Sequence, residues 1–483
     1  MSRRAIPGFV VVLAALVAIV VGGRDTPPIA DAVFSAPAGT WMPAVTDSDA
    51  LSANWFCPGV PADDVDGVGG EVRVVNRHEE PLAGQFTVLT PEGVGGEASF
   101  VVDAWDSTVI DVDSYVDAPF ASVMVELDGD RGFVEQRVVH PAGQSVSPCA
   151  DDTSSEWYLA DGFTVDGSLE TIIISNPYDD PVVADLVFST ESGESRPAAF
   201  QGFTVAPRSV EAIEIAELGA RDEPVIATSI EAMSGRMVVG RAQHYLGGGR
   251  LGYQVVLAAP ALRDQFWFAN GQLGDGIEES YSIYNPTDDS VIVSAIFLGL
   301  PVESNFGNVD PITVGPREVL VFDPSDEQWG ATIPDGRHAV VFGTEAQPAI
   351  VVERVTSSTD PVATTAVVGA PPRPDGFVAS TWHVGIGPDE PTEEALVVYN
   401  VDNVDASVTV EAVGPSGPVA VPSLTDIPLG PGAVLAIDLT ADAVLNNELI
   451  VSSTNRVFVE RALRSDVGDD TRTGSWALPE SVN

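Results

Sequence analysis

The chain has 483 residues, and its 22 basic and 71 acidic side chains give a net charge of −49. All the basic residues are arginine, so lysine-dependent chemistry is excluded, and the acidic balance excludes nucleic acid as a partner. Hydrophobic residues make up 45% of the chain, enough to bury several cores. Abundant glycine, proline and valine favour short strands joined by turns.

The first segment, residues 1–24, is predicted to be a signal peptide or a membrane anchor. Arg3 and Arg4 precede an apolar run from Ile6 to Gly23, whose length suits either a signal peptide or a minimal spanning helix. Residues 25–50 contain four prolines and predict an extracytoplasmic stalk. The N-terminus is expected in the cytoplasm, and the remainder on the outer face of the cell membrane, or secreted if the segment is cleaved.

The only two cysteines, Cys57 and Cys149, fit an exported protein. An even number of cysteines in an oxidising compartment predicts one disulfide, which closes a long loop. Metal binding by this pair is the weaker alternative, because no cluster of histidines accompanies it.

An internal repeat then divides the chain into four predicted modules, at 51–150, 151–262, 263–373 and 374–483. Each module opens with a tryptophan, continues to an apolar strand that ends in asparagine, and closes with a strand that carries arginine. The tryptophans are expected in the cores, and the arginines in structural ion pairs or carbonyl contacts. These residues are Trp55, Trp157, Trp267 and Trp382; Asn76, Asn176, Asn285 and Asn400; and Arg137, Arg241, Arg354 and Arg461.

The modules predict an all-β protein of tandem immunoglobulin-like antiparallel β-sandwiches. Their length of about 100 residues, closely spaced turn signals and lack of helical periodicity are typical of this class. A β-propeller of four large blades is the architectural alternative. It requires one four-stranded sheet in each blade, whereas each copy contains six or seven expected strands.

A resemblance to a known family follows from two stretches of sequence. Trp157-Tyr158-Leu159-Ala160-Asp161-Gly162, followed by Glu170 and Ser175-Asn176-Pro177, resembles a tandem module of secreted bacterial proteins. With the opening Trp55-Phe56-Cys57-Pro58-Gly59, the chain from about Trp41 resembles an uncharacterised family of exported actinobacterial proteins that carry a domain of unknown function. The fourth copy departs from the pattern at His383 and Val401. The resemblance implies an envelope location and supplies no mechanism.

The chain shows no sequence motif of a known catalytic or metal site, and no cofactor is expected. Calcium is the one metal considered, because Asp66, Asp166 and Asp275 each precede a glycine and are followed by Glu71, Glu170 and Glu279, respectively. Ordinary turn formation explains the same pattern.

The predicted function is that of a non-enzymatic cell-envelope protein with a structural, adhesion-like or protein-binding role. Its predicted partners are the membrane, through the N-terminal segment, and an envelope protein or glycan. The first alternative is carbohydrate binding by aromatic side chains such as Trp105 and Trp329, which lie outside the repeated frame. The second alternative is an exported hydrolase.

Overall fold

A computed structural model describes residues 42–46, 50–63, 65, 67–300, 309–330, 333–345, 348–360, 362–370, 379–387, 391–439, 444, 447–465 and 471–481. The predicted signal peptide or anchor at residues 1–24 and the calcium candidate Asp66 lie outside these ranges. Among the residues described, no helix has both the length and the apolar character needed to cross a bilayer. Residues Thr40–Asn483 form one compact unit.

The described residues are almost entirely β-strands and turns, and the strands of the first two modules are as follows. Module 1 contains β2 (Ala53–Ala62), β3 (Gly69–Asn76), β4 (Leu82–Thr90), β5 (Gly93–Val102), β6 (Ser107–Asp111), β7 (Ala118–Leu127), β8 (Gly132–His140) and β9 (Gly143–Pro148). Module 2 contains β10 (Glu156–Leu159), β11 (Leu169–Asn176), β12 (Val182–Thr190), β13 (Gly193–Ser195), β14 (Phe203–Val205), β15 (Ser209–Glu214), β16 (Ala227–Ser234), β17 (Val238–Gly247) and β18 (Arg250–Leu257).

The last two modules repeat this succession of strands. Module 3 contains β19 (Gln265–Leu273), β20 (Ile277–Asn285), β21 (Val291–Leu298), β22 (Ile312–Val314), β23 (Glu318–Phe322), β24 (Gly336–Thr344), β25 (Val351–Thr359) and β26 (Val362–Val368). Module 4 contains β27 (Thr381–Val384), β28 (Pro391–Asn400), β29 (Ala406–Gly414), β30 (Gly417–Ala420), β31 (Ile427–Leu429), β32 (Val434–Asp438), β33 (Leu449–Ser453), β34 (Val457–Ser465), β35 (Thr471–Trp476) and β36 (Leu478–Ser481). Short 3-10 turns complete the described elements, at Val112–Ser114, Val165–Gly167, Ala198–Phe200, Ile215–Leu218, Glu327–Trp329 and Pro422–Leu424.

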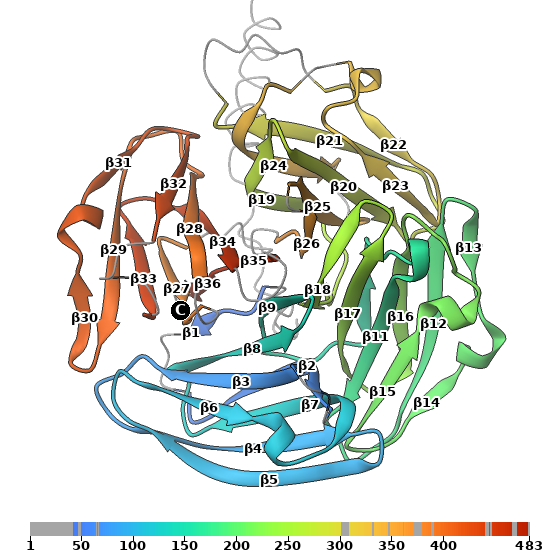
Figure 1. Ribbon diagram of the computed structural model, residues 1–483, viewed down its shortest axis with the longest axis horizontal. Helices are drawn as coiled ribbons and strands as arrows, with labels where there is room; N and C mark the ends of the chain where they lie inside the picture. The colour runs from blue at the N-terminus through green and yellow to red at the C-terminus, as the bar shows by residue number, and fades with distance from the viewer. Residues whose placement is uncertain are drawn as a thin grey trace, which may run out of the picture. The chain divides into compact units, whose positions relative to one another are not determined.

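In the described residues these strands form eight small sheets, two in each module (Figure 1). Module 1 packs the sheet β2-β7-β4-β5 against the sheet β6-β3-β8-β9, and the pattern recurs three times. The corresponding pairs are β10-β16-β12-β13 with β15-β11-β17-β18, β19-β24-β21-β22 with β23-β20-β25-β26, and β27-β33-β29-β30 with β32-β28-β34-β35. The prediction of an all-β protein of tandem sandwich-like modules is therefore confirmed.

The strand order within a module differs from that of an immunoglobulin domain. If the first seven strands of module 1 are lettered A to G, B pairs with E and C pairs with F, as in immunoglobulins. However, A pairs with F and G pairs with B, so strands that share a sheet in immunoglobulins are separated here. The modules share the sandwich architecture with immunoglobulins but connect their strands differently.

Strand β11, in the second sheet of module 2, is buried on both faces over its last five residues. In β11 the residues Ile172, Ile173 and Ile174 are all buried, whereas the first-sheet strand β29 alternates between buried and partly exposed positions. Ile172 and Ile174 belong to the main core, and Ile173 belongs to a second cluster that includes Leu89 and Val138 of module 1. The second sheet of module 2 thus packs on its own module and on module 1.

The four modules close into a ring around their inner strands. β9 lies against β18, β18 against β26, β26 against β35, and β35 against β9 (Figure 1). Side chains tie these strands together, because Ser145 Oγ accepts from Val255 N at 2.9 Å and Gln254 Oε1 accepts from Ala366 N at 2.8 Å. The cavity bordered by all four strands measures only about 20 Å³. The ring shares its closure with a propeller, but its axis is filled where propellers have a channel.

The first and last described strands take part in this closure. β1 (Val45–Thr46) pairs in parallel with β36, which continues the first sheet of module 4. Met42 and Val45 are buried, and Ala44 N donates to Asp151 Oδ2 at 3.0 Å. Residues 42–46, expected within the stalk at 25–50, are therefore part of the folded ring, because β1 extends the edge of the module 4 sheet and Met42, Ala44 and Val45 are buried.

The repeated asparagines form the same buried clasp in every module. The Nδ2 groups of Asn76, Asn176, Asn285 and Asn400 donate to the carbonyl four residues ahead at 2.8–2.9 Å. Each Oδ1 accepts from the backbone N–H two residues ahead at 3.0–3.1 Å. The short side-chain amide of asparagine can donate to the backbone carbonyl and accept from the backbone N–H at the same time. It therefore holds the turn closed, which explains why asparagine recurs at this position.

The repeated tryptophan lies in the core of modules 1, 2 and 4, but not in the core of module 3. Trp55, Trp157 and Trp382 are at most 2% exposed, whereas Trp267 is only partly buried. Trp267 bridges to Ala370 as Tyr158 bridges to Ala259, so Phe266 takes the core position in module 3. The core prediction for Trp267 therefore needs correction by one residue, because neighbouring side chains on a strand face opposite sides.

The disulfide between Cys57 and Cys149 is confirmed. Both cysteines are fully buried, their Cα atoms lie 4.5 Å apart, and the bond ties the first strand of module 1 to the segment after its last strand. A disulfide of this kind indicates an oxidising, extracytoplasmic compartment.

Candidate functional site

In module 1 the repeated arginine lies one strand position away from its counterparts in the other three modules. Arg241, Arg354 and Arg461 each lie opposite the residue four positions before the repeated asparagine. In module 1 that place opposite Val72 belongs to Gln136, and Arg137 follows one residue later. Arg137 therefore faces the other side of the sheet, where its Nη1 pairs with Glu71 Oε1 at 3.3 Å. All four arginines form ion pairs, but Arg137 is not the counterpart of the other three.

Two module interfaces contain a buried ion pair that crosses from one module to the next. At interface 2/3, between modules 2 and 3, Arg241 Nη2 lies 2.8 Å from Glu353 Oε2, and neither side chain is exposed. Glu353 also accepts from Ala160 N of module 2 at 2.9 Å. We call this arrangement, an arginine and a backbone N–H of one module holding a glutamate of the next, the crossing pair.

The crossing pair recurs at interface 3/4. Arg354 Nη1 lies 3.0 Å from Glu460 Oε2, and Glu460 accepts from Asn270 N at 2.8 Å. The guanidinium of Arg354 also lies 5.5 Å from the ring centre of Phe268, a favourable cation–π distance. The same chemistry therefore joins modules 2, 3 and 4 in series.

A looser version closes the ring at interface 4/1. Glu135 has the strand position of Glu353 and Glu460, and it accepts a hydrogen bond from the backbone of Gly385 in module 4. Burial raises the pKa of Glu135, and attraction by Arg461 opposes the rise. Arg461 itself binds Glu394 of its own module and donates to Gly385 O at 2.8 Å.

Interface 1/2 lacks every component of the crossing pair. Gln136 stands in the arginine position, Gly240 in the glutamate position, and Pro58, which has no N–H, in the loop position of Ala160. An added Cβ at Gly240 would lie 3.0 Å from Pro58 Cγ, so the proline fills the space of the missing carboxylate. An apolar cluster joins the two modules instead, and it consists of Leu89, Val138, Ile173, Val210, Ala242 and Val255, with Phe120 and Tyr253 packed against it.

A second buried carboxylate accompanies the crossing pair at interface 2/3. Glu170 is fully buried, and neither of its carboxylate oxygens has a hydrogen-bond partner among the described residues. Burial raises the pKa of Glu170 to about 8; Arg241 opposes the rise, and Asp161 and Glu353 add to it. The equivalent residue of module 3, Glu279, is instead bound by His338 Nε2 at 3.0 Å. Burial, with no hydrogen-bond partner in the described part of the chain, therefore favours the protonated form of Glu170.

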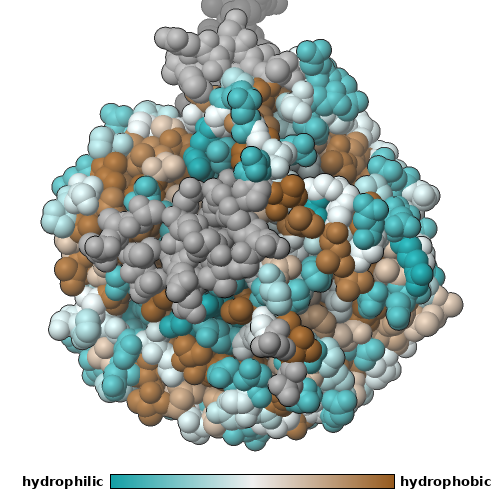
Figure 2. All heavy atoms as spheres, in the orientation of Figure 1, coloured by the Kyte–Doolittle hydropathy of each residue, from teal (hydrophilic) through white to brown (hydrophobic). Residues whose placement is uncertain are grey.

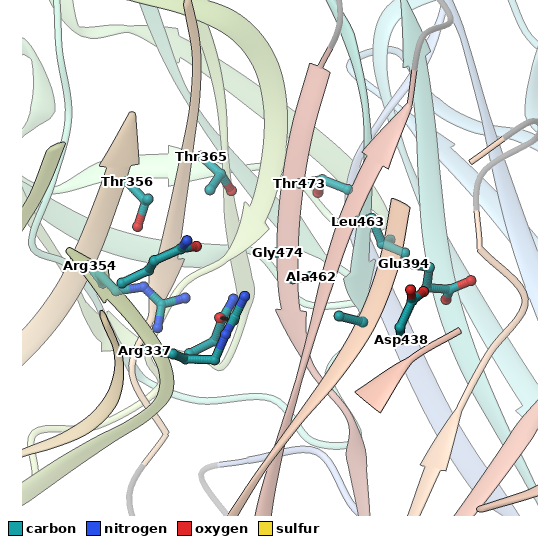
Figure 3. Close-up of a pocket in the computed structure, with 13 residues that line it drawn as sticks. Arg337, Arg354, Thr356, Thr365, Glu394, Asp438, Ala462, Leu463, Thr473 and Gly474 are labelled. Atoms are coloured by element: carbon teal, nitrogen blue, oxygen red, sulfur yellow. Dashed lines mark hydrogen bonds between the residues drawn. The ribbon is translucent and has the colours of Figure 1, made fainter. Parts of the chain in front are cut away.

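A polar pocket of about 310 Å³ lies at interface 3/4 (Figure 3). Asn270, Gln272, Arg337, Arg354, Thr356 and Thr365 line it from module 3, and Glu394, Ala395, Asp438, Ala462, Leu463, Thr473 and Gly474 line it from module 4. Figure 3 shows the two arginines on the opposite side of the pocket from Glu394 and Asp438. The pocket thus has guanidinium groups on one wall, carboxylates on the other and threonine hydroxyls between them.

The buried floor and the open mouth of this pocket are built differently. Arg354 and Glu394 are almost fully buried and belong to ion pairs, with Glu460 and Arg461, respectively. At the mouth, Asp438 is exposed, and partly buried Arg337 donates to the side chain of Asn270. Charged side chains that are already paired stay fixed in position when a ligand arrives.

The predicted calcium residues do not converge. Asp166 Oδ2 accepts from Gly248 N at 2.8 Å, a turn contact, while Glu170 lies buried at interface 2/3. Asp275 begins a turn, and Glu279 is bound by His338. Within the described ranges, no group of three or more metal-binding side chains has a geometry that could hold an ion.

Trp105 and Trp329 are not exposed platforms. Trp105 has a positive φ of 55° and packs beside Gly417 of module 4, where an added Cβ would lie 3.3 Å from its ring. Trp329 is partly buried and packs on Phe322, with ring centres 5.2 Å apart. The alternative of carbohydrate binding through these two rings therefore loses its premise, because both rings already contact protein.

The structure also brings together two histidines that the sequence left apart. His140 ends β8 in module 1, His244 lies on β17 in module 2, and their ring centres are 4.6 Å apart. The ring of His140 stacks on Tyr253 at 4.3 Å. Burial and the neighbouring His244 lower the pKa of His140 to about 4. Both histidines lie in the later part of equivalent strands, one position apart in register, so little in the sequence indicated their contact.

No family model matches the chain, and no curated protein matches it. Two solved structures show limited likeness. Thermotoga maritima 1070 is 17% identical, with a TM-score of 0.20, over 22% of this chain and 94% of that one. A Bacteroides eggerthii structure, described as "a putative cell adhesion protein", is 8% identical, with a TM-score of 0.08, over 88% of this chain and 98% of that one. At these TM-scores neither structure carries an argument about function, and the resemblance to exported actinobacterial proteins stays a prediction.

Proposed function

We propose that the chain is a non-enzymatic, extracytoplasmic scaffold of the cell envelope that holds a rigid surface against another envelope component, in adhesion or protein binding. The observation that carries the proposal is the closed ring. Each module is locked to both neighbours by buried contacts, and β1 and β36 join the two ends of the ring. Modules fixed in this way present their loops in constant positions, as a binding scaffold requires.

The surface of the protein favours contacts with a partner through both polar and apolar side chains. Figure 2 shows polar and apolar residues interspersed over the visible face. Large exposed apolar side chains come from different modules, among them Leu51, Met233, Ile292 and Val419. The net charge of −49 would repel acidic polymers and favours a partner with a basic or neutral surface.

Crosslinking in the native envelope, read out by mass spectrometry, tests this proposal. We expect a reproducible neighbour that crosslinks to two or more modules of the unaltered chain. Val45→Pro, which disrupts the β1–β36 pairing, should reduce those crosslinks, whereas Leu51→Pro, at an exposed position outside any strand, should preserve them. Failure to find any neighbour, or equal crosslinking by the Val45→Pro chain, would contradict the scaffold.

The exported hydrolase is the competing class of function. We expect no turnover of chromogenic ester, glycoside or peptide substrates by the purified chain. Turnover that co-purifies with the folded protein would overturn the non-enzymatic part of the proposal.

A further inference from the structure

Module 2 has an aromatic plug that module 3, which lines the pocket at interface 3/4, lacks. In module 2, Phe163 and Tyr245 lie with ring centres 5.8 Å apart, and Arg250 covers Phe163 at 4.5 Å. Phe163 comes six residues after the core Trp157, and the residue six after Phe266 is Gln272. Tyr245 comes four residues after Arg241, and the residue four after Arg354 is Ser358.

Gln272, which lines the pocket, thus stands in the place of Phe163, and Ser358 stands in the place of Tyr245. A crossing pair lies beside the pocket as well, since Arg354 pairs with Glu460 at 3.0 Å as Arg241 pairs with Glu353 at 2.8 Å. The crossing pair therefore forms both beside the plug, at interface 2/3, and without it, at interface 3/4.

The lining is polar but carries no net charge, with two arginines and two acids. A ligand with a full charge would have to compete with the existing pairs of Arg354 with Glu460 and of Glu394 with Arg461. A hydroxyl group can donate to a carboxylate and accept from a guanidinium or a threonine at the same time, without breaking either pair.

We infer that this pocket binds a neutral sugar residue of an extracellular glycan. Its volume of about 310 Å³ suits a ligand of one to two sugar rings. Neighbouring sugar hydroxyls need both donors and acceptors. The planar side chains of Gln272 and Arg337 at the mouth, and the hydroxyl of Thr356 on the floor, supply them. The extracytoplasmic location indicated by the disulfide places glycans within reach, and the net charge of −49 disfavours anionic ones.

The test is a titration of the purified, oxidised chain, followed by ligand-observed NMR and calorimetry. The probes are glucose, galactose, mannose, N-acetylglucosamine and their disaccharides, with glucuronate and free alanine as charged comparisons. We expect saturable binding of at least one neutral saccharide and none of the charged comparisons. Absence of binding by every neutral saccharide, or binding of a charged probe alone, would overturn the inference.

A plugged variant assigns the binding to this pocket. Gln272→Phe restores the aromatic residue of module 2 and should weaken saccharide binding about tenfold or more. Gln85→Phe, on the exposed face of β4 in module 1, is the matched control and should bind as the unaltered chain does. Thermal unfolding of each variant separates lost binding from lost folding. If Gln272→Phe folds normally and binds equally well, the pocket is not the sugar site.

Discussion

Interfaces 1/2 and 2/3 join equivalent faces of equivalent modules, yet they use opposite chemistry. Interface 2/3 buries Arg241 against Glu353 and the N–H of Ala160. Interface 1/2 has a neutral residue in all three places and an apolar cluster around Ile173 and Val138. The three replacements form a set, because a buried guanidinium or carboxylate without its partner would destabilise the ring by several kcal/mol. In repeated interfaces of this kind, the residues that interact with one another are therefore replaced together.

Removal of the disulfide is expected to have the largest effect on stability. The bond lies beside interface 1/2 and not beside interface 2/3, so its removal distinguishes the two interfaces. Cys57 lies next to Pro58, which packs on Gly240 at interface 1/2. The bond closes a loop of 92 residues, so replacing both cysteines by alanine should lower the free energy of unfolding by about 4–5 kcal/mol in the chain-entropy description. Urea denaturation of the double variant measures the loss. Equal stability of the oxidised and reduced unaltered chain would show that interface 1/2 does not depend on this bond.

Breaking the crossing pair comes next. Arg241→Ala leaves Glu353 buried without its guanidinium and should cost about 3–5 kcal/mol. Replacing both partners, with Arg241→Met and Glu353→Leu, imitates the apolar solution of interface 1/2 and should cost much less. Urea denaturation of Arg241→Met, Glu353→Leu and the double variant gives the coupling energy. A double variant less stable than Arg241→Ala would show that the ion pair cannot be exchanged for apolar packing here.

Glu170 should make interface 2/3 more stable in acid. Its pKa in the folded chain is about 8, raised from 4.5 by burial, so folding loses stability as pH rises from about 4.5 to 8. Glu170→Gln removes this loss and should raise the free energy of unfolding at pH 8 by on the order of 3 kcal/mol, with little change at pH 4.5. Thermal unfolding across this pH range provides the measurement. A uniform shift at all pH values would point to packing as the cause.

His140 should give interface 1/2 the opposite dependence on pH. Burial and His244 lower its pKa in the folded chain to about 4 from 6.5, so its contribution to stability is complete above pH 6.5 and is lost as pH falls towards 4. Because the ring is only half buried, the expected loss is about 1 kcal/mol. His140→Asn should flatten this part of the pH profile, as measured by urea denaturation at pH 7 and pH 4.5. An unchanged profile would assign the acid sensitivity to another group.

The sequence allowed the modules and their turns to be predicted, but not the facing of every strand. The four asparagines perform one task in one geometry, so their spacing was a sufficient guide. In Phe266-Trp267-Phe268 every residue is aromatic, and only strand pairing reveals that Phe266 and Phe268 face the core. In Glu135-Gln136-Arg137 two residues are charged, and a shift of the strand register by one residue would place these charges on the opposite face of the sheet.

The ring and the pocket could not be predicted from the sequence. Arg241 and Glu353 are 112 residues apart, and β1 pairs with a strand more than 400 residues later. Such contacts leave no local periodicity, because each partner satisfies only the pattern of its own strand. The pocket was hidden for a related reason, since the exchange of Phe163 for Gln272 becomes visible only after Phe266 is recognised as the core residue of module 3.

The pairing of β1 with β36 also constrains the order of assembly. Synthesis proceeds from the N-terminus, so the first three modules can each pair their own strands as they emerge, while β1 waits for the last strand to be made. Until then, the face of module 1 that receives module 4 stays open to solvent and to other chains. Completion of the ring is therefore a late event, and an interrupted chain would expose an uncovered strand edge of the kind that promotes aggregation.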